Sequence, residues 1–350
     1  MSAEPTSTTA AVPARNPERA APIFIVGPDR SGTTLIYAIV ASHPNISMVR
    51  RTNMWRYFHD RYGDLSDPAN LDRCLDAMLR YQRLTHLEPD ADRIRREFLQ
   101  GEPSYGRLFA LFHEHNAERA GKTRWGDKSL HTEHYADRVF AEYPDATILH
   151  MVRDPRDRYA SAKKRHGQDL SRVGAATGRW LESTRIGRRN AARWPGRYVV
   201  IRYEDLAREP EATTREICRA IGEPFVPEML AMGGAEDHAG RGNSSFGDVE
   251  TNAISTRAIG RYRQVLTPSE IAFVELVAGR AMTRSGYRRE GSGLRGMGRV
   301  RFVVWDLPFQ LARMGGWIMT ERRHRRRGVE VPEGRILDEA EDAEDERYDR

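Results

Sequence analysis

Two short segments of the chain combine residue types that suit the binding of phosphate. Gly27–Thr34, GPDRSGTT, has two glycines, an arginine and three hydroxyl side chains directly after the apolar run Ile23–Val26. Arg153–Ser161, RDPRDRYAS, follows the apolar run Thr147–Val152 and places a serine eight positions after its first arginine. Backbone N–H groups at a helix start, an Arg fork and a hydroxyl donor all bind phosphate oxygens. Both segments therefore suit anion sites; taken alone, the first also fits an ordinary strand-to-helix turn and the second an exposed basic helix start.

The first segment differs from the loop that binds nucleoside triphosphates. That loop reads G-x-x-x-x-G-K-[ST], and Thr33 stands here where the lysine would be. The glycine spacing is the same, whereas the lysine that usually contacts the β- and γ-phosphates is missing. A P-loop kinase or nucleotide hydrolase remains an alternative, which Thr33 disfavours.

The two segments need a scaffold that places strand ends and helix starts side by side. Strands are predicted at 23–26, 147–152 and 198–201, each followed by a helical pattern, and a further helix at 268–285. Residues 68–120 are helical and charged, which predicts a helical insertion. The predicted fold is α/β: a P-loop-like parallel sheet flanked by helices on both faces.

Composition and charge narrow the function classes. Hydrophobic residues make up 39% and charged residues 30% of the 350 residues, and residues 1–20 form a polar lead-in that we expect to be disordered. Only Cys74 and Cys218 are present, which favours a reducing, cytoplasmic compartment. The net charge of +6 is scattered, so it favours an anionic ligand over nucleic acid.

The two segments together resemble the cofactor signatures of the sulfotransferase superfamily. P-x-x-R-S-G-T-T follows the first strand, and R-D-P-R-D is followed by a serine at the matching interval. The chain is most similar to tyrosylprotein sulfotransferases and their bacterial relatives. The resemblance runs from Pro22 to Tyr287 and includes RSGTTLIYAIVASHP, GDKSL, FAEYPDATILHMVRDPRD, RYEDLAREPE and the GRYR-type segment Ala258–Arg263.

The resemblance implies sulfuryl transfer from 3′-phosphoadenosine 5′-phosphosulfate (PAPS), without a metal, to a hydroxyl of a carbohydrate, lipid or small-molecule acceptor. It implies that the 5′-phosphosulfate is held by Arg30, Ser31, Gly32, Thr33 and Thr34. The 3′-phosphate would be held by Arg153 and Ser161, with further cofactor contacts from Arg165, Tyr203 and Arg261. The implied catalytic residues are Arg30, Lys128 and Ser245.

The sequence departs from the tyrosylprotein pattern after its His-Pro dipeptide. Arg50-Arg51 stands where those enzymes have an acidic pair, which favours an anionic or carbohydrate-like acceptor and leaves the general base open. Candidates for that base are His59, Glu102 and His131. A non-catalytic protein that binds 3′-phosphoadenosine 5′-phosphate (PAP) is the second alternative. No compact metal-ligand spacing is visible.

The resemblance places a sulfotransferase domain at 21–290 and a C-terminal extension at 291–350. Within the extension, 301–327 is apolar and basic, and the chain ends in an acidic tail. Asp306, Pro308 and a Gly pair interrupt the apolar run, so it is a poor candidate for a membrane span. We expect it either to pack on the core or to contact a membrane surface or partner.

Overall fold

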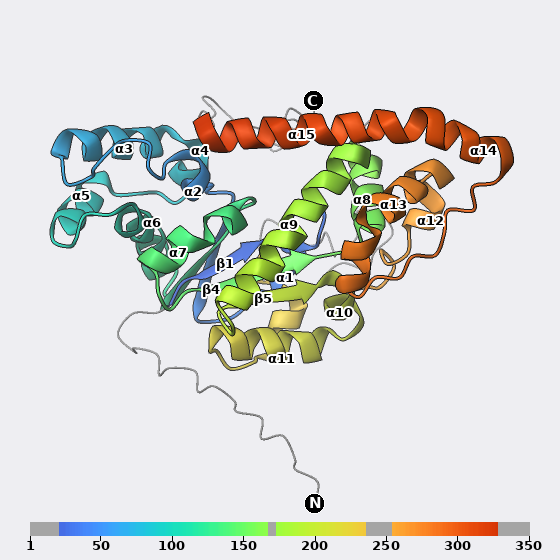
Figure 1. Cartoon of the computed structure of the whole chain (residues 1–350). Coiled ribbons are helices and arrows are strands. Elements are labelled where there is room, and N and C mark those ends of the chain that lie inside the picture. Colours follow the sequence, from blue (N-terminus) through green and yellow to red (C-terminus); the bar gives the residue numbers. More distant parts are fainter. Residues whose placement is uncertain (1–20, 167–172, 236–253, 328–350) are drawn as a thin grey trace, which may run out of the picture.

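One parallel sheet of five strands organises the chain (Figure 1). The computed structural model describes residues 21–166, 173–235 and 254–327. The strand order is β2-β3-β1-β4-β5, and all four neighbouring pairs are parallel. The strands are β1 (Ile23–Val26), β2 (Ile46–Arg50), β3 (Arg124–Lys128), β4 (Thr147–Val152) and β5 (Tyr198–Arg202).

Helices cover both faces of this sheet, as predicted. Successive side chains of a strand point to opposite faces, so Phe24 and Val26 join one apolar cluster while Ile23 and Ile25 join another. The first cluster includes side chains of α6 (Tyr105–Arg119) and α7 (Ala136–Glu142). The second includes α1 (Thr33–Ala41), α10 (Tyr203–Arg208) and α11 (Pro210–Ile221).

The predicted helical insertion lies between β2 and β3. It consists of α2 (Met54–Tyr57), α3 (Pro68–Arg80), α4 (Gln82–Thr85), α5 (Ala91–Leu99) and α6. Asp67 and Asp90 begin α3 and α5 because their side chains accept hydrogen bonds from the backbone N–H groups of Ala69 and Arg93. The buried faces of these helices join the cluster that contains Phe24.

Three of the five strands match the prediction, and β2 and β3 were not predicted. β3 reads RWGDK and yet is buried along its whole length. Its Arg124 is tolerated there because it donates to the carbonyl oxygens of Ala21 and Ile221 and pairs with Glu223 at 2.8 Å. Hydrophobic periodicity cannot identify a strand whose polar side chains find their partners only in the folded chain.

The chain after β3 is mainly helical. Besides α7, α10 and α11, its described helices are η1 (Thr132–Tyr135), α8 (Pro155–His166), α9 (Val173–Arg193), η3 (Pro227–Ala231), α12 (Tyr262–Val265), α13 (Pro268–Arg284), α14 (Gly296–Arg301), the π-helical turn η5 (Phe302–Asp306) and α15 (Leu307–Arg327). The predicted helix at 268–285 corresponds to α13. Thr267 and Glu270 begin it with a capping box.

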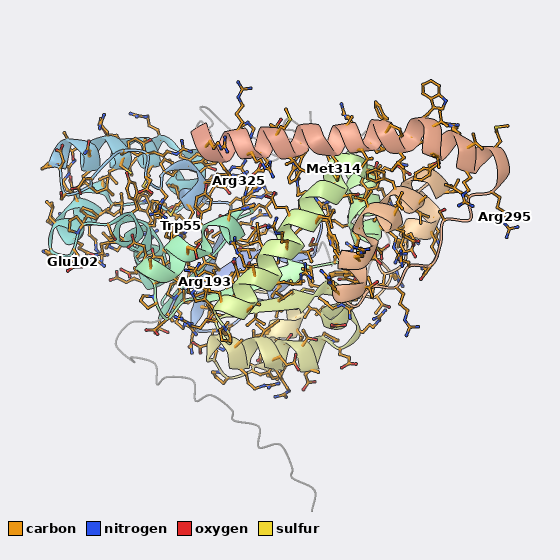
Figure 2. All side chains as sticks on the ribbon, in the orientation of Figure 1. Trp55, Glu102, Arg193, Arg295, Met314 and Arg325 are labelled. Carbon is orange, nitrogen blue, oxygen red and sulfur yellow. The ribbon has the colours of Figure 1, made fainter. Side chains whose placement is uncertain are left out.

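Helix α15 crosses one side of the molecule and packs on α9 (Figure 1). The two helices approach closely at Gly174 and Gly178 of α9. The Gly174 N–H donates to Gln310 Oε1 at 3.0 Å, and a Cβ at Gly178 would lie 2.9 Å from Met314 Cγ. Met314 lies between the two helices in Figure 2. Within the described ranges, no helix is long and apolar enough to cross a membrane.

This close approach predicts opposite effects for two glycine-to-alanine substitutions. Gly174→Ala would push a methyl group into the Gln310 carbonyl and should lower the free energy of unfolding by about 1–3 kcal/mol. Gly315→Ala in α15 meets no atom within 4 Å and should raise it by about 1 kcal/mol, since alanine favours the helix. Chemical denaturation measures both. Equal effects would contradict the packing.

Candidate functional site

The phosphate loop, residues 27–34, lies at the carboxyl end of β1 and opens α1. Gly32 is the N-cap of α1 with φ 90°, and no side chain caps the helix. The first N–H groups of α1 are therefore left for an anion. The Ser31 hydroxyl is fully buried and has no hydrogen-bond partner among the described residues. A side chain at Gly32 would lie 2.5 Å from the Tyr203 ring, so the loop requires glycine there.

The second anion element, residues 153–161, lies next to it. Arg153 ends up just after β4, and Ser161 lies in α8. The Arg153 guanidinium donates to the carbonyl oxygens of Arg30 at 3.1 Å and of Ala258 at 2.8 Å. Arg30 Nε in turn donates to Ser161 Oγ at 3.2 Å. The structure thus brings together two segments that lie far apart in the sequence.

Arg153 is buried beside the phosphate loop. Its described hydrogen bonds go to neutral carbonyl groups, its Nε is buried without a hydrogen-bond partner among the described residues, and it stacks 4.4 Å above the Tyr203 ring. Tyr203 is buried at the start of α10 and thereby supports both Gly32 and Arg153. The carboxylates of Asp157 and Glu204 lie near enough to interact with Arg153 electrostatically, and an acceptor beside Nε would add a hydrogen bond to this cation.

Lys128 and Arg261 approach the same region from other elements. Lys128 is buried at the carboxyl end of β3, in register with Ile25 of β1, which is two residues before the phosphate loop. Arg261 precedes α12, and the Asp157 carboxylate holds this segment by accepting from the N–H groups of Gly260 at 2.6 Å and Tyr262 at 2.9 Å. These contacts place residues 258–262 against α8 and Arg153.

Two expected site residues cannot be placed. Ser245 lies outside the described residues, and of Arg165 only the backbone, at the end of α8, is described. Their roles stay predictions.

Asp29 braces the phosphate loop, a role that the sequence analysis missed. Its carboxylate pairs with Arg158 of α8 and with Arg179 of α9 at 3.0 Å. Burial by itself would raise the pKa of Asp29, but the two guanidinium groups outweigh it and hold that pKa well below its usual range. The Asp in the loop was visible in the sequence, whereas nothing there indicated Arg179 as its partner.

A pocket opens beside the phosphate loop and encloses about 330 Å³ of empty space, including the part open to solvent. It is bounded by the loop, by the segment that follows β3, by α9 and by α15. The lining side chains include Pro28, Leu130, His131, Glu133, Ser183 and Trp317. Trp317 shows that the C-terminal extension contributes to this pocket.

Of the three candidate bases, only His131 lines the pocket. Glu102 is exposed at the far end of the helical insertion (Figure 2). His59 packs between Trp55 and Tyr105, with ring centroids 5.2 and 5.3 Å away. His131 has a left-handed backbone, φ 69°. Burial, followed by the charges of Arg56 and other cations, lowers its pKa well below the usual value, so its imidazole is neutral at pH 7.

A chain of hydrogen bonds orients Glu133, which the sequence analysis did not consider. Tyr198 Oη lies 2.6 Å from His150 Nδ1, His150 Nε2 lies 3.0 Å from Ser183 Oγ, and Ser183 Oγ donates to Glu133 Oε1 at 3.0 Å. Burial lowers the pKa of His150 to about 3, so its ring is neutral and can accept from Tyr198 while donating to Ser183. Glu133 Oε2 is buried and has no hydrogen-bond partner among the described residues.

His131, His134 and Glu321 form a cluster whose ligand atoms lie within 4.8 Å of one another. Sequence spacing could not reveal it, because Glu321 comes from α15. Burial is the largest cause that lowers the pKa of His131, and the charges of the nearby Arg56, Arg179 and Arg325 lower it further. The same positive charges disfavour a divalent cation, so we assign no metal to this cluster.

The parallel sheet, with residues 27–34 and 153–161 side by side at the carboxyl ends of β1 and β4, defines a P-loop-like α/β fold. The chain belongs to the sulfotransferase family, whose family model matches residues 22–227.

Comparisons with individual proteins agree with this family assignment. Carbohydrate sulfotransferase 3 of Rattus norvegicus is 28% identical over 163 residues, which are 41% of this chain and 34% of the relative. Carbohydrate sulfotransferase 2 of Mus musculus is 34% identical over 97 residues, 28% of this chain and 18% of the relative. The chain thus matches about a third or less of the length of these relatives.

Among solved structures, the sulfotransferase domain of the Synechococcus PCC 7002 olefin synthase is similar in fold. Its TM-score is 0.52 at 20% sequence identity, and the match covers 77% of this chain and 96% of that domain.

The brace at Asp29 predicts a large loss of stability when Arg158 is removed. Arg158→Gln should lower the free energy of unfolding by about 3 kcal/mol, because a buried carboxylate loses a partner. Adding Asp29→Asn should recover part of the loss. The folded-state pKa of Asp29 lies below 3.8, so this contribution is present above pH 3.8 and is lost as the pH falls further.

The exposed pair Arg193–Asp137 provides the control. Arg193→Gln should change the free energy of unfolding by less than about 1 kcal/mol, since both side chains are at least half exposed. If Arg158→Gln and Arg193→Gln lowered the free energy of unfolding equally in denaturation experiments, the ion pair of Asp29 with Arg158 would contribute no more to stability than an exposed pair.

Proposed function

We propose that the protein is an enzyme that transfers the sulfuryl group of PAPS to a hydroxyl of an acceptor. The observation that carries this proposal is the contact between the phosphate loop and the second anion element, through Arg30, Ser161 and Arg153. One nucleotide with phosphates at its 5′ and 3′ ends would bridge the two elements. Family membership supports the reaction.

The buried groups left without hydrogen-bond partners fit such a ligand. Within the described part of the chain, Ser31 Oγ and Arg153 Nε lack hydrogen-bond partners, and no side chain caps α1 at Gly32. We assign the 5′-phosphosulfate to Arg30, Ser31, Gly32, Thr33 and Thr34. We assign the 3′-phosphate to Arg153 and Ser161, with Tyr203 supporting Arg153 and with Arg165 and Arg261 as additional cations.

The chemistry is a displacement at sulfur. The acceptor oxygen forms a bond to sulfur, the bond from sulfur to the 5′-phosphate oxygen breaks, and the acceptor proton passes to a base. Arg30 and Lys128 stabilise the charge that develops on the departing phosphate, and Ser245 is expected to assist them. His131 takes the proton, because it is the candidate base that lines the pocket and it is neutral.

Glu133 positions the acceptor in this proposal. Its Oε2 has no described hydrogen-bond partner, while its Oε1 is fixed by Ser183. A hydroxyl group of the acceptor would satisfy Oε2. A carbohydrate presents several such hydroxyls, and the relatives named above are carbohydrate sulfotransferases. Arg50 ends β2 in register with Lys128, and the Arg51 N–H donates to the Lys128 carbonyl, which favours an acceptor that also carries negative charge.

Ser161→Ala tests the ligand. It should weaken the binding of PAP by about tenfold, since one hydrogen bond to a charged phosphate is lost. The binding of AMP, which lacks the 3′-phosphate, should not change. Isothermal titration calorimetry measures both affinities. An equal loss for AMP and PAP would mean that Ser161 does not contact the 3′-phosphate.

Thermal stabilisation separates the alternatives. PAP should raise the melting temperature more than ATP with magnesium does, because a ligand that binds only the folded state stabilises it. The reverse order would favour a kinase or nucleotide hydrolase. Radiolabelled transfer to a panel of sugars, lipids and phenols then identifies the acceptor, and PAP binding without transfer to any of them would favour the non-catalytic alternative.

His131→Asn and Glu133→Gln should affect turnover differently. His131→Asn should lower kcat by about 10²–10⁴-fold, whereas Glu133→Gln should mainly raise KM for the acceptor. Because the pKa of His131 is lowered, the acid limb of kcat/KM should lie below pH 6.5. Steady-state kinetics over pH 5–9 measures this. If Glu133→Gln removed turnover and His131→Asn did not, the two roles would have to be exchanged.

A further inference from the structure

The outer side of the C-terminal helices carries most of the exposed apolar surface. Among the residues that the structure describes, eleven large hydrophobic side chains are exposed, and eight of them belong to 297–319. We call these eight the apolar strip: Met297, Val300, Val303, Val304, Trp305, Phe309, Leu311 and Met319. Trp305 is 72% exposed and Met297 80%. Such a concentration is unusual for a surface that faces only water.

The opposite side of the same helix faces the protein. Gln310, Trp317 and Glu321 are buried, and Trp317 lines the pocket. The packing of α15 on α9 therefore uses one face of the helix and leaves the apolar strip outside (Figure 1). The packing of α15 on α9 therefore does not bury the apolar strip.

The strip is accompanied by positive charge. Residues 295–327 contain nine arginines and only two acidic residues, Asp306 and Glu321, which is a formal excess of seven positive charges. This exceeds the net charge of +6 of the whole chain. Arg299, Arg322, Arg323 and Arg326 are exposed, and Arg295 lies at the outer end of the molecule (Figure 2).

We propose that the helices α14, η5 and α15 dock on a membrane surface that contains anionic lipids. Apolar side chains with an exposed Trp enter the boundary between headgroups and acyl chains, while flanking arginines bind the phosphates of the lipids. The helix lies on the membrane and does not cross it, in agreement with the absence of a spanning helix from the described residues. An apolar strip alone would also suit a second copy of the chain, but the surrounding arginines would then face one another and repel.

Docking in this orientation has a consequence for the pocket. Trp317 contacts the pocket from the inner side of the helix whose outer side would lie on lipid. The membrane surface would therefore lie one helix diameter from the site. The docking surface itself is independent of the reaction proposed above, and it can be tested without an acceptor.

Co-sedimentation with vesicles tests the docking surface in the full chain. The protein should bind vesicles of phosphatidylcholine with phosphatidylglycerol, and bind phosphatidylcholine alone more weakly. The double variant Val304→Glu/Trp305→Glu should reduce binding by about tenfold or more, because it removes apolar contact and adds charge. Leu276→Glu is the matched control: Leu276 is 60% exposed on α13, outside the strip, and its variant should bind as the wild type does.

The arginines need a separate variant. The triple variant Arg322→Gln/Arg323→Gln/Arg326→Gln should weaken binding to the anionic vesicles by about tenfold or more and make it less sensitive to salt. Unchanged melting temperatures should show that all variants are folded. Absence of vesicle binding by the wild type, or equal binding by Val304→Glu/Trp305→Glu and Leu276→Glu, would overturn the proposal. So would a dimer, seen in sedimentation velocity without vesicle binding, that Val304→Glu/Trp305→Glu abolishes.

Discussion

The structure depends on placing several arginines close together in a buried region without a charge imbalance that would unfold it. Arg156 meets Asp154 at 2.7 Å and Glu275 at 2.5 Å, and Arg158 meets Asp29, so each has carboxylate partners. Arg153 differs, because its described hydrogen bonds reach only carbonyl oxygens. The nearby carboxylates of Asp157 and Glu204 interact with Arg153 electrostatically and offset its charge, which helps it to stay buried.

The same compensation shapes the phosphate loop. Asp29 ties the loop to α8 and α9, so the residues after it are held in one conformation before any ligand arrives. Gly32 is the N-cap of α1 and lies against the Tyr203 ring, and no described side chain caps the helix there. A loop that is organised in advance loses little conformational entropy if a ligand binds to it.

Helix α15 connects the site with the surface of the molecule. One side of it contributes Trp317 to the pocket and Glu321 to the cluster with His131 and His134. Its other side exposes the apolar strip. The sequence reads as apolar and basic throughout this region, and only the packing on α9 separates residues that face the pocket from residues that face outward.

Much of the scaffold followed from local sequence. The apolar runs of β1 and β4 are buried on both faces, and that of β5 is partly buried, so all three are recognisable without knowing their neighbours, and each is followed by a helix as the parallel fold requires. Gly27–Thr34 and Arg153–Ser161 were also identified, because the two motifs occur together, in the order and at the interval of the sulfotransferase signatures. Their roles as ligand contacts remain predictions.

Only the tertiary structure determines the partners of polar groups when those partners are distant in the sequence. β3 could not be recognised, because its Arg124 is stabilised by Glu223, which lies 99 residues later in the sequence. Nothing in the sequence distinguished Glu133 from other acidic residues, and only the folded chain brings Tyr198, His150 and Ser183 into one hydrogen-bonded chain that ends at its carboxylate. Burial and hydrogen-bond direction depend on all neighbours at once, so a linear sequence shows which groups are present but not which of them are left without a partner.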